Sequence, residues 1–259
     1  MNDRSISVGL DRDRIAVLTG LILVVAAGSI YLIRGAGLEM GQMAMDDGMA
    51  MMPDWTPGYT ALVFIMWAVM MTTMMLPGGL PAIDRIARNA RGASPGTSGI
   101  AAAVSFAVGY LLVWSAFGLA ATILQRELAS RELLSETMAL RSTRLAALSL
   151  IAIGLYQFAP LKRACLSHCR TMAACVRSDQ YPSTGAMLRQ GARYGISCAG
   201  CCAALMGVLF VAGVMNLFWV AMIALWVLAE KSLPWGASLA RLAGLGFIGW
   251  GGLLLALPS

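Results

Sequence analysis

The six cysteines of this chain lie close together, at spacings that suit metal ligands on helices. In the first group, PLKRACLSHCRTMAAC, Pro160 can open a helix, because proline is tolerated at the first helical position. Cys165, His168 and Cys169 then follow at i, i+3 and i+4 and share one helix face. Cys175 lies off that face but near it, and His168 is the only histidine of the chain. These four side chains are candidate metal ligands.

A second group, GISCAGCCAALM, has the same character. Cys198, Cys201 and Cys202 share one helix face, and Met206 extends it by one turn. Both groups belong to the segment 161–195 and its helix ends, which we expect to be a cysteine-rich cytoplasmic loop. The two groups can therefore approach each other, and we predict that they build one shared site with ligands from two elements.

Methionines form two further groups. The segment MGQMAMDDGMAMM is polar, acidic and glycine-containing, so its sulfur atoms are unusual for a water-facing loop. We predict that 34–58 is a methionine-rich loop outside the membrane, with these candidate ligands: Met40, Met43, Met45, Met49, Met51 and Met52. In the helix that follows, methionines recur every fourth residue along one strip, in which Met70 and Met74 are candidate ligands. Met71 and Met75 form the adjacent row.

The compartments predict which ion these sulfur atoms bind. Cytoplasmic thiols stay reduced and can act as thiolate ligands, whereas thioethers cannot form disulfides and remain available outside. The soft ion that accepts both ligand types is Cu(I). Zinc is possible at the Cys and His groups alone, but it leaves the methionines without a purpose.

Structural roles compete with each of these interpretations. Methionine in a membrane helix can be lipid-facing or can fill the core, and cysteine is small enough to pack between helices. The outer loop can be a linker, although linkers usually contain serine, glycine or glutamate. Glu230 and Lys231, at the end of an apolar segment, are expected to pair with each other or to reach the membrane interface.

Composition predicts the fold class. The chain of 259 residues is 59% hydrophobic and only 12% charged, about half the charge content of soluble proteins. We therefore expect an all-α, polytopic transmembrane bundle in a single membrane domain, 1–259, with about seven spans (six to seven) and the lipid bilayer as its surroundings. No small-residue cleavage site follows the first span, so a cleaved signal peptide is not expected. The expected spans are 15–33, 59–80, 100–124, 145–160, 196–214 and 239–257, with a short seventh at 216–229.

The basic residues predict the orientation. With the N-terminus in the cytoplasm, fourteen of the 19 Lys and Arg residues fall inside and five outside, which supports an N-in, C-out arrangement. Topology then accounts for the net charge of +6, and no nucleic-acid partner is needed. Two local features complete the expectation. Pro77 should end the second helix, and the charged segment 125–144 should form an amphipathic helix on the outer surface.

Four motifs resemble a family of bacterial integral membrane proteins catalogued as predicted metal-binding or copper-chaperone-like. They are W…MMTTMMLP (67–77), PLKRACLSHCR (160–170), GISCAGCCAALM (195–206) and the pair EK (230–231). The resemblance implies a metal-binding role in the bacterial inner (plasma) membrane, as a multi-pass protein. It also implies that the ligands are Cys165, Cys169, Cys198, Cys201 and Cys202. The outer methionine loop is less typical of that family, so its role rests on its chemistry.

The leading hypothesis is a protein that handles Cu(I). The outer loop would capture the ion, and the cytoplasmic cysteines would bind it or deliver it to a copper-accepting protein. No phosphate-binding loop is present, so ATP-driven pumping by this chain alone is not expected. We expect no enzymatic activity, and the enzymatic alternative is a membrane thiol–disulfide relay. The third hypothesis is a non-catalytic subunit of a larger membrane complex.

Overall fold

The structure is a computed structural model that describes residues 12–35, 55–93, 99–135, 138–174 and 183–256. Apart from one bridge between Leu134 and Leu140, all regular secondary structure in these residues is helical, which confirms the predicted all-α class. The helices are α1 (Arg12–Ile33), α2 (Pro57–Ala93), α3 (Gly99–Ser130), α4 (Thr143–Tyr156), α5 (Pro160–Ala174), α6 (Thr184–Met206), α7 (Val208–Ala212), α8 (Leu217–Ser232) and α9 (Gly236–Ala256).

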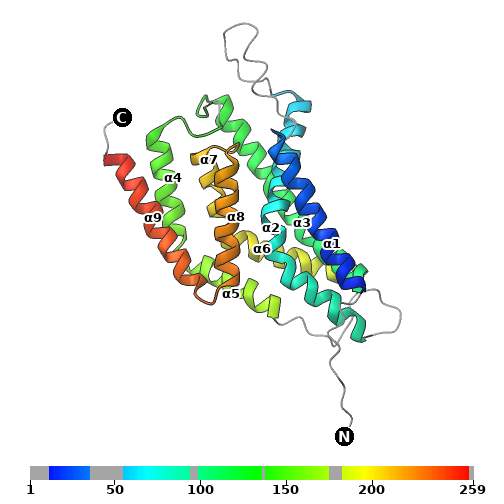
Figure 1. The fold of residues 1–259 in the computed structure, drawn as a ribbon. Helices are drawn as coiled ribbons and strands as arrows, with labels where there is room; N and C mark the ends of the chain where they lie inside the picture. The colour runs from blue at the N-terminus through cyan, green and yellow to red at the C-terminus, as the bar shows by residue number, and fades with distance from the viewer. Residues whose placement is uncertain (1–11, 36–54, 94–98, 136–137, 175–182, 257–259) are drawn as a thin grey trace.

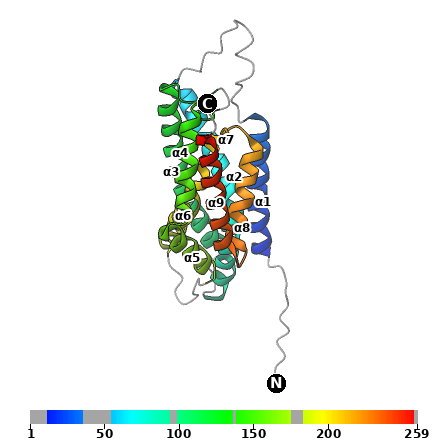
Figure 2. The same cartoon turned by 90° about the vertical axis from the view of Figure 1, so that its left-hand side faces the viewer.

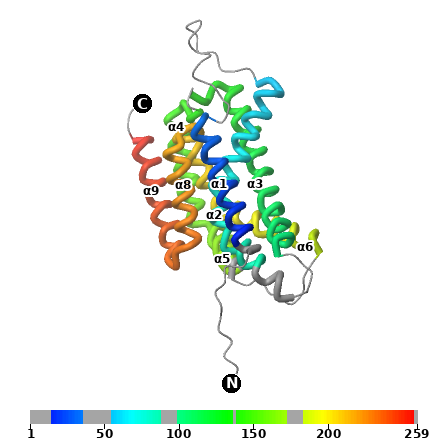
Figure 3. The backbone as a smooth tube through the Cα atoms, turned by 45° about the vertical axis from the view of Figure 1, so that its right-hand side comes forward, coloured from blue at the N-terminus to red at the C-terminus, as the bar shows by residue number. Residues whose placement is uncertain are grey.

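The helices form an elongated bundle in which the long helices run roughly alongside one another (Figure 1). α1 packs against α2, α2 against α3, and α3 against α6, while α4 packs against α9 on the other side of the bundle. α8 contacts both α2 and α9, as the view in Figure 3 also shows. The short helix α5 lies at the end of the bundle where α1 begins, and α7 lies toward the opposite end (Figure 2).

Five helices in the described part of the chain are long and apolar enough to cross a membrane. A sixth span results if α4 and α5, which meet at a bend of 58°, are counted together. The expected seventh span corresponds to α8, whose 16 residues extend about 24 Å at 1.5 Å per residue, less than a ~30 Å hydrocarbon core. α1 begins and α9 ends at opposite ends of the bundle (Figure 1), as an odd number of spans requires. The side that faces the cytoplasm stays a prediction.

The second helix does not end at Pro77, contrary to the sequence-based expectation. α2 continues through Pro77 and Pro81 to Ala93. Proline is tolerated inside a membrane helix where neighbouring groups satisfy the local backbone. Near the two prolines, Tyr110 of α3 donates a hydrogen bond to the Met75 carbonyl (2.8 Å), and Tyr194 of α6 donates one to the Gly78 carbonyl (3.4 Å). These bonds tie the proline-containing part of α2 to its neighbours, although they do not go to the carbonyls four residues before the prolines.

The expected surface helix over 125–144 is also wrong for most of its length. α3 covers the segment to Ser130, and the described residues after it form turns, with positive φ at Glu132 and Met138 (both 56°). Leu134 is fully buried, and the Leu140 amide donates to the Phe210 carbonyl (2.8 Å). Burying Leu134 and pairing these backbone groups requires a folded-back loop, which an amphipathic helix lying on the surface does not provide.

Glycine brings α3 and α6 into backbone contact and thereby fixes the helix that carries the second cysteine group. A Cβ on Gly109 would stand 2.0 Å from the Leu188 carbonyl oxygen, and a Cβ on Gly191 would stand 2.0 Å from that of Phe106. Neither position can accept a larger residue without separating the helices. Small residues at helix contacts are the usual means of close packing in membranes.

Candidate metal centre

Four thiols from α5 and α6 meet in the interior of the bundle. Cys169 and Cys201 are 2% exposed, and Cys198 and Cys202 are fully buried. The Cys169 thiol interacts electrostatically with the thiols of Cys198 and Cys201, and the Cys202 thiol interacts with the same two. We call these four residues the thiol cluster. The cysteine groups of α5 and α6 therefore lie together, because α5 packs against α6.

Much of the segment 161–195, predicted to be a loop, is helical. α5 begins at Pro160 as expected, and α6 begins at Thr184. The cysteines of the cluster are free thiols. Two of them donate hydrogen bonds to the Cys198 carbonyl one turn back, Cys201 at 3.1 Å and Cys202 at 2.8 Å. Both sulfur atoms are thus held by their own helix rather than turned toward a common point.

A lysine contacts the cluster from α8. Lys231 Nζ donates to Cys198 Sγ at 2.7 Å, and its side chain packs against Gly78 of α2. The Tyr110 hydroxyl, which donates to the Met75 carbonyl, also lies 3.2 Å from Cys198 Sγ. Cys198 is therefore the centre of the cluster, with the Lys231 ammonium donating to its sulfur and the Tyr110 hydroxyl oxygen beside it.

The methionine strip of α2 reaches the cluster through Met75, whose Sδ lies 3.8 Å from Cys202 Sγ. Met75 belongs to the row adjacent to the predicted ligands Met70 and Met74. The whole strip is buried, which excludes a lipid-facing role for it, with exposures of 4% or less at Met66, Met70, Met71, Met74 and Met75.

The remaining predicted ligands lie around this centre or outside the described residues. Cys165 is half-buried against α6, where a Cβ on Gly200 would stand 2.6 Å from its sulfur. His168 is exposed, whereas Met206 is buried at 1% exposure, one turn beyond Cys202. The following predicted ligands fall outside the described residues: Cys175, Met40, Met43, Met45, Met49, Met51 and Met52.

The expectation that Glu230 and Lys231 pair with each other is wrong. Glu230 instead forms a buried ion pair with Lys162 of α5, at 2.8 Å, and accepts a hydrogen bond from Trp226 Nε1 at 2.9 Å. Adjacent residues on a helix point about 100° apart, so one turns toward α5 and the other toward the cysteines. An ionisable residue within an apolar membrane helix is by default a candidate for function. The position of Glu230 and Lys231 at the end of an apolar segment is therefore the sequence signal that could have identified them as functional.

No three or more Cys, His, Asp or Glu side chains in the described part of the chain are arranged as a ready metal-binding group. The donors that the thiol cluster offers are nevertheless of one chemical kind, with thiol sulfur from α5 and α6 and a thioether from α2. Such a soft set suits Cu(I), and a harder ion would favour oxygen or imidazole ligands.

The chain matches the PpoB2 family, described as a copper chaperone, over residues 64–254. This covers most of the chain, so the protein belongs to that copper chaperone family, as the sequence resemblance indicated, and its function is copper-related. The matched region contains the thiol cluster and the buried methionine strip, and it begins after the methionine-rich segment 34–58. No curated protein and no solved structure matched the chain.

Proposed function

We propose that the protein is a multi-pass protein of the bacterial inner membrane that binds Cu(I) at the thiol cluster and delivers it on the cytoplasmic side. The observation that carries the proposal is the meeting of four thiols and the Met75 thioether, from three helices, in a buried position. Burial withholds these sulfur atoms from oxidants in solution. The thiols alone would also suit zinc, and the Met75 thioether beside them favours Cu(I).

The contacts around Cys198 describe how the cluster would take up an ion. A sulfur beside an ammonium group is in an environment that stabilises a thiolate, the form that binds metals. Lys231 would thus hold Cys198 ready as a ligand and balance its charge in the absence of the ion. Cys201 and Cys202 would then rotate, give up their thiol protons to the solvent, and exchange their hydrogen bonds to the Cys198 carbonyl for bonds to the metal.

The methionines supply a route to this site. The strip from Met66 through Met70 and Met74 spans about two turns of α2 and leads toward the row that contains Met75. The six methionines of the loop 34–58 would collect Cu(I) outside the membrane. Ordering that loop costs ~1–2 kcal/mol for each residue fixed, so its affinity would be modest, as a donor site requires.

Release would proceed on the side of α5. Cys165 is half-buried and His168 exposed, so they offer donors between the thiol cluster and the solvent. A copper-accepting protein could take the ion from these groups, and exchange between ligands would drive delivery without ATP. This order of donors, thioethers first and thiols last, makes each step favourable.

Substitution of single thiols tests the shared site. We expect that Cys169→Ser and Cys202→Ser each remove most of the copper from the purified full-length protein, because each takes one sulfur from the same buried set. Ala203→Ser is the matched control, since it adds a hydroxyl to the same helix and removes no sulfur. Copper per chain would be measured after reconstitution under reducing conditions, together with thermal unfolding. Full copper retention in either cysteine variant would disprove a site shared between α5 and α6.

The same sample separates the two competing functions. A thiol–disulfide relay, favoured by the contacts among the thiols, would show disulfides and no copper after air exposure. A structural subunit of a larger complex would show free thiols and no copper. Copper binding with reduced thiols therefore supports the proposal against both.

A further inference from the structure

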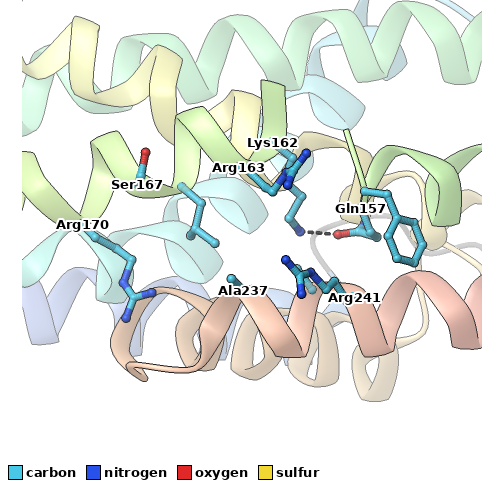
Figure 4. A pocket seen from close by; sticks show the side chains of 10 residues that line it. Gln157, Lys162, Arg163, Ser167, Arg170, Ala237 and Arg241 are labelled. Carbon is cyan, nitrogen blue, oxygen red and sulfur yellow. Dashed lines mark hydrogen bonds between the residues drawn. The ribbon is translucent and has the colours of Figure 1, made fainter. Parts of the chain in front are cut away.

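A second pocket, distinct from the thiol cluster, opens between α5 and α9 beside the bend that follows α4 (Figure 4). Its volume is about 420 Å³. Lys162 and Arg241 converge beside Gln157 from the two helices, and Arg170 lies at the other end. The ten lining residues are Gln157, Phe158, Lys162, Arg163, Leu166, Ser167, Arg170, Ala237, Ala240 and Arg241.

Positive charge dominates this pocket. Four of the lining residues are cationic and none is acidic. Glu230 balances only Lys162, through the buried ion pair. The remaining charge belongs to Arg163 and Arg241, which are exposed at the rim, and to Arg170, which donates to the Leu233 carbonyl. A guanidinium carries five N–H donors, so Arg170 retains donors for a ligand.

The floor of the pocket contains a donor that the protein leaves unused. Gln157 is 1% exposed, and its Oε1 accepts a hydrogen bond from Lys162. Its Nε2 has no hydrogen-bond partner among the described residues. An unpaired buried donor costs free energy unless a ligand or water supplies an acceptor. The charge and the unpaired donor thus require the same kind of ligand, one rich in acceptor oxygens.

We propose that this pocket binds a phosphate group, carried either by the headgroup of an anionic phospholipid or by a free phosphate compound. Phosphate oxygens match the planar donors of arginine and provide the acceptor that Gln157 Nε2 lacks. Basic pockets between membrane helices bind anionic headgroups. The apolar side chains of Phe158, Leu166 and Ala240 also line the pocket and suit the attached hydrocarbon of a lipid.

Lipid retention by the full-length protein tests this site. The protein would be delipidated in detergent and titrated, under native mass spectrometry, with phosphatidylglycerol and with phosphatidylcholine of the same acyl chains. We expect preferential retention of phosphatidylglycerol. Its affinity should fall about tenfold in Arg163→Gln and in Arg241→Gln, because each variant loses one charge-assisted hydrogen bond. Arg189→Gln and Arg193→Gln are matched controls, because these arginines are exposed on α6, away from the pocket, and should leave retention unchanged.

A second arm identifies the source of the phosphate. Inorganic phosphate that competes with the lipid, or that binds alone with the same dependence on Arg163 and Arg241, marks a free phosphate compound as ligand. Phosphate that neither binds nor competes, with the lipid preference intact, marks the lipid. Equal retention of the two lipids without phosphate binding, or equal losses in the α6 controls, would overturn the proposal. Copper bound by the Arg163 and Arg241 variants should stay unchanged, which separates this result from that of the thiol cluster.

Discussion

Two buried polar clusters each contain one of two neighbouring residues of α8, Glu230 and Lys231, and they differ in the partner that this residue contacts. Glu230 completes the carboxylate cluster, in which Lys162 and Trp226 both donate to its carboxylate. Lys231 completes the thiol cluster, where its ammonium faces the sulfur of Cys198. The first cluster matches a hard cation with a hard anion inside the protein. The second pairs a hard ammonium with a soft sulfur, which a soft metal ion can bind more strongly.

The difference indicates that neighbouring positions serve different ends. A buried charge that already has a close opposite charge gains nothing from a further ion, so the carboxylate cluster holds α5 to α8. The thiols of Cys201 and Cys202 donate only weak hydrogen bonds to a backbone carbonyl, and they can exchange these at little cost. We infer that the carboxylate cluster is structural and that the thiol cluster exchanges its partners during function.

The largest expected effect comes from breaking the structural cluster. Glu230→Gln leaves the Lys162 ammonium buried without a counter-charge, which should lower the free energy of unfolding by about 3–5 kcal/mol. Chemical unfolding of the purified protein in detergent would measure the loss. Copper per folded chain should stay at the wild-type level, because no sulfur ligand is removed.

Two controls sharpen that result. Glu127→Gln removes an exposed ion pair with Arg131 (3.5 Å) and should change stability by less than about 1 kcal/mol. The double variant Lys162→Met with Glu230→Gln removes both charges and should recover most of the loss. Loss of copper at unchanged stability in Glu230→Gln would break the comparison, since the carboxylate would then belong to the metal centre.

A smaller effect is expected from removing the Met75 thioether, which lies beside the thiol cluster. Met75→Leu conserves side-chain volume, so its cost in stability should stay below about 1.5 kcal/mol. The affinity for Cu(I) should fall severalfold, because a sulfur 3.8 Å from Cys202 is lost. Competition with a Cu(I) chelator measures that affinity. Met222→Leu is the control, as Met222 is 44% exposed on α8, and an equal drop in both variants would assign Met75 to packing alone.

The smallest effect on bound copper concerns the loop 34–58. Replacing its six methionines with serine should leave the copper bound at saturating concentration unchanged, because the thiol cluster is intact. The copper dose response of cells that express the variant should shift to higher external copper, since the collector is lost. The matched control exchanges Gln42 and Ala44 of the same segment for serine, which changes the segment without removing sulfur. An identical dose response would leave the loop as a spacer.

The sequence predicted the apolar helices and the thiols of the candidate site. Apolar runs located the five membrane-length helices of the described residues, and i, i+3, i+4 spacing grouped the cysteines that lie together on α6. The sequence-based prediction of helix ends was wrong where tertiary contacts outweigh local preference. Pro77 lies inside α2, where tyrosines of α3 and α6 bond to nearby carbonyls, and the charged segment after Ser130 forms turns with Leu134 buried.

The sequence by itself determined the all-α fold, the presence of two thiol groups and a methionine strip, and the family to which the chain belongs. Residue types and helical spacing are local properties, and one chain carries them completely. Only the tertiary structure decided that Glu230 turns to Lys162, that Lys231 turns to Cys198, and that Met75 is the methionine in contact with the thiols. These partners lie 33 to 127 residues apart, and the rotation of each helix about its axis, which packing sets, selects them.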